Sequence, residues 1–289
     1  MSSPSSPSGP SGPFAPFAPS APSAPSPPGS ARRLWALDGP RLTMDRAELL
    51  DGAEPGPVRL VVPAFLVEHD DGLLLLDAGL DPRAASDADG AVATFGDIGH
   101  RIEYAPRQRV DRQIEALGFA TADVTHVVLS HAHFDHTGGL RLFPDATFLV
   151  GAGDRPSVRG EEDEIARPED LAPARDFTWT FLDGDHDVFG DGAVVVLAMP
   201  GHTPGNTSLL VRLPRRTILL TADTAHLRGA LRTGAPMSAD TDKAAAARSL
   251  ARLGEVAARE GAEVWVGHDP DDWERFGAPG PVDGATSRG

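Results

Sequence analysis

Four side chains that can bind metal ions stand together in the segment SHAHFDHTGG. They are His131, His133, Asp135 and His136, which fall within six residues. Because alternate residues of a loop can converge on one side, His131 and His133 could bind one ion. Asp135 and His136 would then face another. The histidines could instead be structural, but four ligand side chains at this spacing favour a metal site.

Three further candidate ligands each follow an apolar segment with strand composition. VVVLAMPG runs into His202, TILLTA into Asp223 and AEVWVG into His268, as THVVLS runs into His131. In layered α/β proteins, functional groups gather where strand ends open into loops. Taken alone, His202 could belong to a turn and Asp223 could cap a helix. Their shared placement instead predicts one site assembled from four strand ends.

The elements that must position these ligands alternate apolar runs with turn signals, which predicts a single mixed α/β domain. Residues 59–67 and 73–77 flank the turn sequence EHDDG and predict a hairpin. Helices are expected at residues 110–118 and 240–260. Further strands are expected at residues 125–130, 146–150, 177–182, 193–199, 207–213, 217–222 and 262–267.

The two ends of the chain differ from this domain. Residues 1–30 are almost entirely Ser, Pro, Ala and Gly and carry no charge, which predicts a disordered tail. The folded domain is expected over residues 31–278, followed by a flexible C-terminus over residues 279–289. Prolines interrupt any secretory core, and no run approaches the roughly 20 apolar residues of a membrane helix. We therefore expect a cytoplasmic protein that does not enter a membrane.

Composition narrows the chemistry further. The sequence contains no cysteine, so any metal must be held by histidine and carboxylate groups. The net charge of −16 lies after the uncharged tail and would repel a phosphate backbone. The expected partner is therefore a small molecule and not a nucleic acid. The number of subunits stays open, with a dimer as one option.

The motifs HAHFDH, GHTPGNTS, TAD and VGHD together resemble the two-metal branch of the metallo-β-lactamase superfamily, over about residues 34–275. Within that superfamily the chain is most similar to the N-acyl-homoserine lactonases, which hydrolyse quorum-sensing signals. The resemblance implies an α/β fold, the αβ/βα four-layer sandwich with two mixed β-sheets flanked by helices. It also implies a hydrolase that acts on ester bonds.

The resemblance implies two zinc ions per chain. His131, His133 and His202 would hold one ion. Asp135, His136 and His268 would hold the other, with Asp223 bridging the two. Histidine and carboxylate ligands also suit iron, cobalt and manganese, so the sequence does not select the metal. Asp77 resembles an aspartate that orients ligands in this family, and a strand-end cap is the alternative.

The implied reaction is attack on a lactone carbonyl by a hydroxide shared between the metals, with Asp135 passing a proton to the departing alkoxide. Related lactonases usually have a tyrosine three residues after the bridging aspartate, where this chain has His226. An imidazole N–H can donate the same hydrogen bond to the substrate, so His226 is a candidate catalytic residue.

Other residues have weaker assignments. Phe65, Phe95 and Ile98 are expected to be ordinary core residues, and lining a groove for an acyl chain is the alternative. Tyr104 could belong to a lid and is not assigned to catalysis. No partner pattern accompanies His69, His100, His126 and His186, so these histidines are expected to be structural or on the surface.

Two other functions remain open. The substitution at His226 leaves room for an arylesterase or organophosphate hydrolase of the same fold. A catalytically silent metal-binding module is the alternative outside enzymes, although such a protein would be expected to lose at least one ligand. Three other groups of this fold fit less well. Many antibiotic-hydrolysing relatives use a cysteine ligand, and glyoxalase-type relatives have an added helical domain. Flavodiiron relatives have a glutamate at the position of His133.

Overall fold

The computed structural model describes residues 29–85, 88–161 and 166–277. The predicted tail over residues 1–30, apart from its last two residues, and the predicted C-terminus over residues 279–289 lie outside these ranges. No helix within the described ranges is long and apolar enough to cross a membrane.

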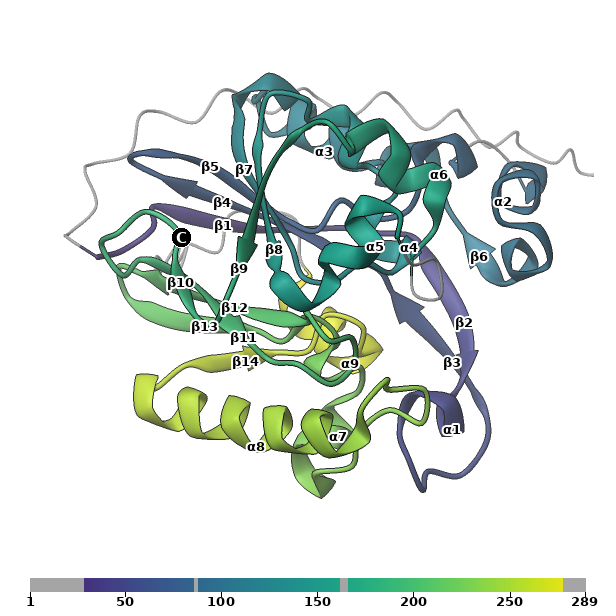
Figure 1. The fold of residues 1–289 in the computed structure, drawn as a ribbon. Helices are drawn as coiled ribbons and strands as arrows, with labels where there is room; N and C mark the ends of the chain where they lie inside the picture. Colours follow the sequence, from purple (N-terminus) through teal and green to yellow (C-terminus); the bar gives the residue numbers. More distant parts are fainter. Residues whose placement is uncertain (1–28, 86–87, 162–165, 278–289) are drawn as a thin grey trace, which may run out of the picture.

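Two mixed sheets form the centre of the molecule (Figure 1). The first has six strands in the order β1-β4-β5-β7-β8-β9, of which β5, β7, β8 and β9 run parallel. Its strands are β1 Arg33–Leu37, β4 Ala64–His69, β5 Gly72–Leu76, β7 Val124–Leu129, β8 Thr147–Gly151 and β9 Thr178–Leu182. The second has five strands, β10 His186–Asp187, β11 Val194–Ala198, β12 Thr207–Leu213, β13 Arg216–Leu220 and β14 Glu263–Trp265.

Helices cover the outer faces of both sheets. Above the first sheet, Ile114 of α3 packs with Leu66 and Leu75 of the sheet. Below the second, Leu253 of α8 packs with Leu219. The α-helices are α1 Arg46–Leu49, α2 Ala88–Phe95, α3 Val110–Ala116, α4 Phe134–Thr137, α5 Arg155–Arg159, α6 Pro168–Leu171, α7 Arg228–Thr233, α8 Lys243–Glu260 and α9 Pro270–Phe276.

Apolar side chains also fill the space between the two sheets. Alternate residues of β5 and β7, such as Leu74 and Val128, face Val196 of β11 and Leu209 of β12. Burying apolar side chains from both sheets against each other is the main driving force for this arrangement. The order of layers is thus helix, sheet, sheet, helix, which confirms the predicted four-layer sandwich.

The predicted strand over residues 59–67 is wrong as a single strand. The chain forms β3 Pro57–Val61, turns at residues 62–63 and then forms β4. Pro63 has no N–H to give to a ladder, so an uninterrupted central strand is disfavoured there. β3 joins a third, three-stranded sheet with β2 Arg41–Asp45 and β6 Ile102–Glu103. The hairpin itself is confirmed, formed by β4 and β5.

The other predicted elements are present with small shifts at their ends. Helix α8 begins at Lys243, three residues later than expected. The carboxylate of the preceding Asp242 accepts a hydrogen bond from the Ala245 N–H. It ends at Gly261, which has a left-handed backbone. Short 3-10 helices are η1 Pro82–Ala84, η2 Gly96–Arg101, η3 Pro106–Gln108, η4 Thr121–Asp123, η5 Leu140–Leu142, η6 Ala152–Asp154, η7 Ala172–Ala174 and η8 Ala222–Thr224.

Candidate metal centre

The seven predicted ligands come together at one edge of the two sheets, as the strand-end pattern predicted. His131 follows β7 and its neighbour Ser130, His202 follows β11, Asp223 lies in η8 after β13, and His268 follows β14. His133, Asp135 and His136 lie at the start of the short helix α4. The four strand ends thus converge, although they are far apart in the sequence.

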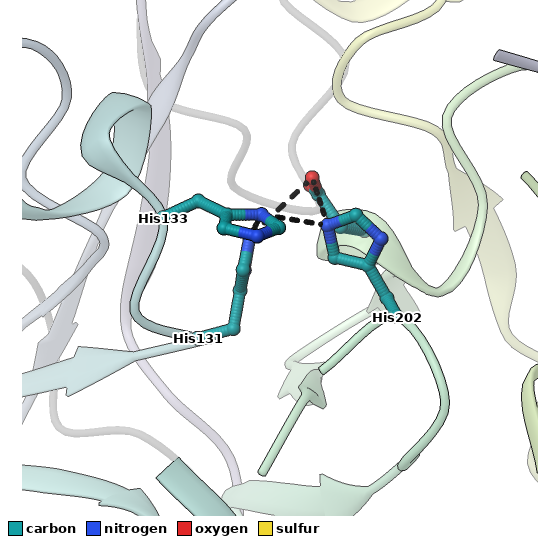
Figure 2. A group of neighbouring side chains, drawn as sticks. His131, His133 and His202 are labelled. Carbon is teal, nitrogen blue, oxygen red and sulfur yellow. Dashed lines mark hydrogen bonds and ion pairs between the residues drawn. The ribbon is translucent and has the colours of Figure 1, made fainter. Parts of the chain in front are cut away.

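The first group of ligands is His131, His133 and His202, together with one oxygen of Asp223 (Figure 2). His133 Nδ1 lies 2.9 Å from His131 Nε2 and 2.9 Å from His202 Nε2. Asp223 Oδ2 lies 3.3 Å from His202 Nε2 and 3.6 Å from His131 Nε2. Bonds of about 2.0–2.1 Å to a first-row metal ion separate neighbouring ligand atoms by similar distances. The four atoms can therefore surround one ion.

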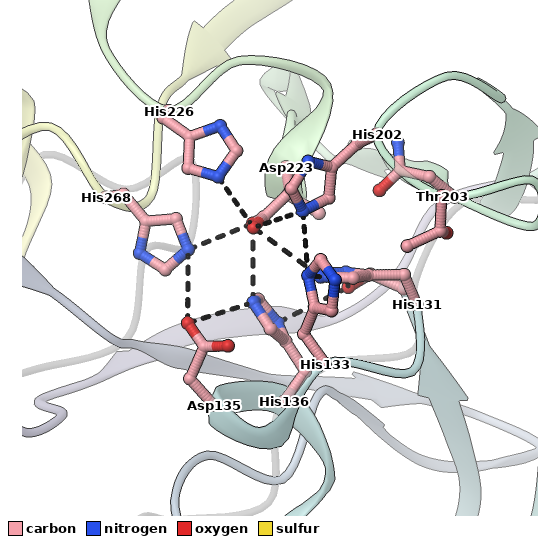
Figure 3. Close-up of polar contacts among 12 residues, drawn as sticks. His131, His133, Asp135, His136, His202, Thr203, Asp223, His226 and His268 are labelled. Carbon is pink, nitrogen blue, oxygen red and sulfur yellow. Dashed lines mark hydrogen bonds and ion pairs between the residues drawn. The ribbon is translucent and has the colours of Figure 1, made fainter. Parts of the chain in front are cut away.

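The second group is Asp135, His136 and His268, together with the other oxygen of Asp223 (Figure 3). Asp223 Oδ1 lies 2.9 Å from His268 Nε2 and 3.4 Å from His136 Nε2. Asp135 Oδ2 lies 3.5 Å from His136 Nε2 and 4.0 Å from His268 Nε2. Because each oxygen of Asp223 faces a different group, this carboxylate is placed to bridge two ions.

Two buried atoms of the centre have no hydrogen-bond partner among residues 29–85, 88–161 and 166–277. They are Asp223 Oδ1 and His136 Nε2. A buried polar atom left unpaired costs free energy, and a metal ion would remove that cost by binding both atoms. The donor set consists of imidazole nitrogens and carboxylate oxygens, which suits a divalent transition metal. These residues fit a two-metal centre.

Hydrogen bonds outside the centre orient four of the imidazole rings through Nδ1. His131 Nδ1 lies 3.0 Å from Ser130 Oγ, and His136 Nδ1 lies 2.8 Å from Asp77 Oδ2. His202 Nδ1 lies 2.9 Å from Asp240 Oδ1, and His268 Nδ1 lies 2.6 Å from the Val61 carbonyl oxygen. With Nδ1 occupied, Nε2 of each ring is left to face a metal.

Asp77 could orient a metal ligand or cap the end of a strand, and the structure favours the orienting role. Its Oδ1 accepts a hydrogen bond from the Ser130 N–H at 2.8 Å, while Oδ2 faces His136. Asp240 was missed, because 38 residues separate it from His202 and its segment MSAD has no ligand pattern. An acidic residue just before helix α8 was the available signal, and it was taken as part of the helix start.

The charges of the metal-free cluster depend on burial and on neighbouring groups. Burial, together with the nearby His202, lowers the pKa of His133 to about 4. Burial also opposes protonation of His202, but hydrogen bonds with Asp223 and Asp240 outweigh it and raise its pKa to about 9. Burial opposes ionisation of Asp223, yet the surrounding imidazoles hold its pKa well below the usual range. An ionised carboxylate therefore stands at the middle of the centre.

His226 faces the same carboxylate. Its Nε2 lies 2.9 Å from Asp223 Oδ2, and its ring stacks on that of His268 with centroids 5.5 Å apart. The side chain is buried, and burial, only partly opposed by Asp223, lowers its pKa. A largely neutral imidazole at this place can donate one N–H toward the metal centre.

The remaining candidates separate into cavity and core. Phe95 and Ile98 line a cavity of about 440 Å³ together with Phe134, which lies between the ligands His133 and Asp135. Phe65 packs in the core against Trp265 and Phe276, which confirms the expected core position over the groove. The side chain of Tyr104 is largely buried, and its hydroxyl donates to the Leu80 carbonyl oxygen, outside the centre.

The four other histidines lie outside both ligand groups. His69 is buried and pairs with Asp191 while stacking on Phe189. His126 contacts the edge of the same phenylalanine ring. His186 is half-buried in β10, and His100 is exposed on η2. Their expected structural or surface positions are confirmed.

Comparison with known proteins gives the same family as the motifs. The sequence profile of the metallo-β-lactamase superfamily matches residues 57–268, more than half of the chain. The chain belongs to this superfamily. It is 36% identical over 241 residues to the N-acyl homoserine lactonase AttM of Azorhizobium caulinodans, covering 77% of this chain and 87% of that protein.

More distant members of the superfamily show the same relation. The N-acyl homoserine lactonase of Bacillus cereus is 26% identical over 242 residues, covering 83% of this chain and 94% of that protein. A solved N-acyl homoserine lactone hydrolase, with N-hexanoyl-L-homoserine bound at its catalytic metal centre, is 25% identical. It superposes with a TM-score of 0.75 and covers 85% of this chain and 96% of that one.

Proposed function

We propose that this protein is a dinuclear metal hydrolase that opens the lactone ring of N-acyl-homoserine lactones or related lactones. The main support for this proposal is that the two oxygens of Asp223 face two separate groups of ligands. Relatives named as N-acyl homoserine lactonases, which the chain matches over most of its length, support the choice of substrate.

In this proposal the first ion is held by His131, His133 and His202, the second by Asp135, His136 and His268, and Asp223 binds both. Zinc is the metal we propose, because it suits imidazole and carboxylate ligands and needs no redox partner. Two such ions, when bound, would supply a water of lowered pKa as the nucleophile and would polarise the substrate carbonyl.

The chain's own residues would bind and orient the lactone. The Nε2 of His226 faces Asp223 Oδ2 at 2.9 Å. Once that oxygen holds a metal ion, the Nε2–H would be free to donate to the substrate carbonyl oxygen, taking the place of the tyrosine in related lactonases. Water adds to the carbonyl carbon, the bond between that carbon and the ring oxygen breaks, and the ring oxygen takes up a proton. Asp135, whose side chain is 13% exposed, would take a proton from the attacking water and deliver it to the ring oxygen. The product is the open N-acyl-homoserine.

The acyl chain would lie in the cavity lined by Phe95, Ile98 and Phe134. Ile98 is 36% exposed, and a bound acyl chain would cover it. Phe134, which lines this cavity, lies between the ligands His133 and Asp135 in the sequence, and this supports the choice of the cavity. The aromatic rings of Phe95 and Phe134, 5.5 Å apart, would contact the chain.

The proposal extends to the setting of the enzyme. Residues 31–278 would form the catalytic domain between tails at residues 1–30 and 279–289, and the protein would act in the cytoplasm. The net charge of −16 supports a small-molecule substrate and not a nucleic acid. Because His226 stands where related lactonases have a tyrosine, one second candidate is favoured, an aryl-ester or organophosphate hydrolase with the same metal centre.

The test combines metal content with a panel of substrates. The purified protein would be analysed for zinc and iron, then assayed with N-hexanoyl-homoserine lactone, a γ-lactone, an aryl ester and an organophosphate. We expect nearly two metal ions per chain and the highest kcat/KM for the acyl-homoserine lactone. His133→Ala should abolish turnover and lower metal content, whereas His186→Ala, which removes a histidine outside the centre, should change neither.

Each other outcome would support a different function or contradict the metal centre. Two metal ions with much faster ester or organophosphate hydrolysis would replace the substrate class and keep the centre. Bound metal with no turnover of any substrate would favour a silent metal-binding module. Absence of metal from the wild-type protein would contradict the centre itself.

A further inference from the structure

Asp154, which the sequence motifs do not single out, is a carboxylate at the end of η6 with 0% exposure. Its Oδ2 accepts hydrogen bonds from the Ala132 N–H at 3.0 Å and from the Thr203 hydroxyl at 2.9 Å. Its Oδ1 accepts a hydrogen bond from the Gly205 N–H at 2.7 Å. Both oxygens are therefore engaged with donors from other loops.

These donors belong to the two loops that carry the first group of ligands. Ala132 lies between His131 and His133. Thr203 directly follows His202. One carboxylate at the end of β8 thus connects the loop after β7 to the loop after β11. These two loops carry His131, His133 and His202.

The backbone around Asp154 leaves little room for this connection to shift. A Cβ atom at Gly151 would lie 2.0 Å from the carbonyl oxygen of Gly205. A Cβ atom at Gly205 would lie 2.7 Å from the carboxyl carbon of Asp154. The end of β8 and the loop after His202 are therefore in direct backbone contact, which only glycine permits at these positions.

A carboxylate is a costly group to bury here. Across residues 29–85, 88–161 and 166–277, no ion pair joins Asp154 to a Lys, Arg or His side chain. Burial raises the pKa of Asp154, and the three hydrogen bonds that it accepts, together with the nearby His202, oppose this. A buried charge whose hydrogen-bond partners are all neutral still costs free energy, so an apolar or amide side chain would be cheaper if packing were its only role. A cation held by the adjacent imidazoles would offset the cost.

We propose that Asp154 is a positioning residue for the first metal ion, because its carboxylate sets the relative placement of the loops that carry His131, His133 and His202. The inference rests on the proposed two-metal centre. It assigns Asp154 to the first ion only. Its donors Ala132 and Thr203 directly adjoin ligands of that ion in the sequence, whereas none of its three donors directly adjoins Asp135 or His268.

Asparagine at this position would keep the shape and lose one acceptor. Its amide group must face either the Gly205 N–H or the Ala132 and Thr203 donors, so one connection breaks whichever way it turns. His202 keeps its separate contact with Asp240. We therefore expect a partial effect, a loss of affinity for one ion of about 10–100-fold, as for other residues that orient metal ligands.

The experiment is a zinc titration of metal-free protein against a competing chelator, with metal per chain measured after dialysis in buffered zinc. Wild type should retain two ions. Asp154→Asn should retain one under the same conditions, with the affinity of the other ion unchanged. Adding His268→Ala to this variant should remove the remaining ion, which would place it in the second group. Thr203→Val, which removes one donor only, should weaken the same ion to a smaller degree.

Asp81→Asn is the matched control. Asp81 is equally buried but pairs with Arg83 and Arg141 and contacts no ligand, so its loss should lower stability and leave both ions bound. If Asp154→Asn and Thr203→Val both bind two ions with wild-type affinity, the inference is overturned. Equal weakening of both ions, as from a general loosening of the fold, would also overturn it. A wild-type protein that binds no metal would instead contradict the proposed centre.

Discussion

Replacing Asp77 with asparagine tests how the second group of ligands obtains the correct form of its imidazole. Asp77 Oδ1 accepts from the buried Ser130 N–H at 2.8 Å, and Oδ2 lies 2.8 Å from His136 Nδ1. A carboxylate accepts from both neighbours at once, so the proton of His136 is held on Nδ1 and Nε2 is free for a metal.

Asparagine has the same shape but only one acceptor oxygen. If that oxygen stays with the Ser130 N–H, the amide group faces His136 Nδ1 and drives the proton to Nε2, where a metal must bind. If the amide turns round, the buried Ser130 N–H loses its acceptor, at a cost of about 1–3 kcal/mol. The backbone adds little, because Asp77 has φ +61 and asparagine tolerates that conformation.

We expect Asp77→Asn to weaken binding of the ion at His136 by about 10–100-fold, equivalent to about 1.4–2.7 kcal/mol. The assay is competition between the metal-free protein and a chromogenic chelator for zinc. Thermal unfolding of the metal-free forms measures any cost to the fold separately. Asp111→Asn is the control, since Asp111 is a buried carboxylate that pairs with Arg109 away from the centre. Wild-type affinity for both ions in Asp77→Asn would refute the tautomer argument.

Three further predictions concern the substrate, the acyl cavity and the pH dependence of stability. His226→Phe should lower kcat about 100-fold by removing a donor to the substrate oxygen, and His226→Tyr should restore most of it; equal kcat in wild type and His226→Phe would rule the role out. Phe95→Ala should lower kcat/KM for long-chain lactones more than for short-chain ones, by roughly tenfold, because it removes apolar contact area; an equal effect on both would argue against the cavity. Burial, partly offset by Arg167, raises the pKa of Asp170 to about 6. The protonated carboxyl therefore stabilises the fold at pH values below the unfolded pKa, and this contribution is lost as the pH rises through about 6. Asp170→Asn should remove a pH-dependent difference of about 2 kcal/mol in the free energy of unfolding, measured by urea denaturation at about pH 4 and about pH 8. Parallel stability curves for the two proteins would contradict this assignment.

Much of the metal centre could be predicted from short stretches of sequence. Each ligand-bearing loop follows an apolar strand directly, as His131 follows the strand over residues 124–129. The link between strand and ligand is local, so the order of residues along the chain is enough to reveal it. The absence of cysteine likewise restricted the ligands to histidine and carboxylate without any structure.

The sequence was misleading where a local pattern had more than one reading. Residues 59–67 are apolar enough for one strand, yet β3 and β4 belong to different sheets. The break at Pro63 depends on which neighbours are available, since β3 pairs with β2 and β4 pairs with β1 and β5. Strand pairing is a property of the whole fold, and alternation alone does not determine it.

The residues that orient the ligands were decided by the tertiary structure alone. Asp154 reaches Gly205 across 51 residues, and Asp240 reaches His202 across 38. Neither carboxylate lies in a motif, because its role depends on a hydrogen-bond donor contributed by a distant loop. The sequence therefore determined the types of ligand and the strand ends that carry them. Which oxygen of Asp223 faces which group, and what holds each ring in place, followed only from packing the two sheets together.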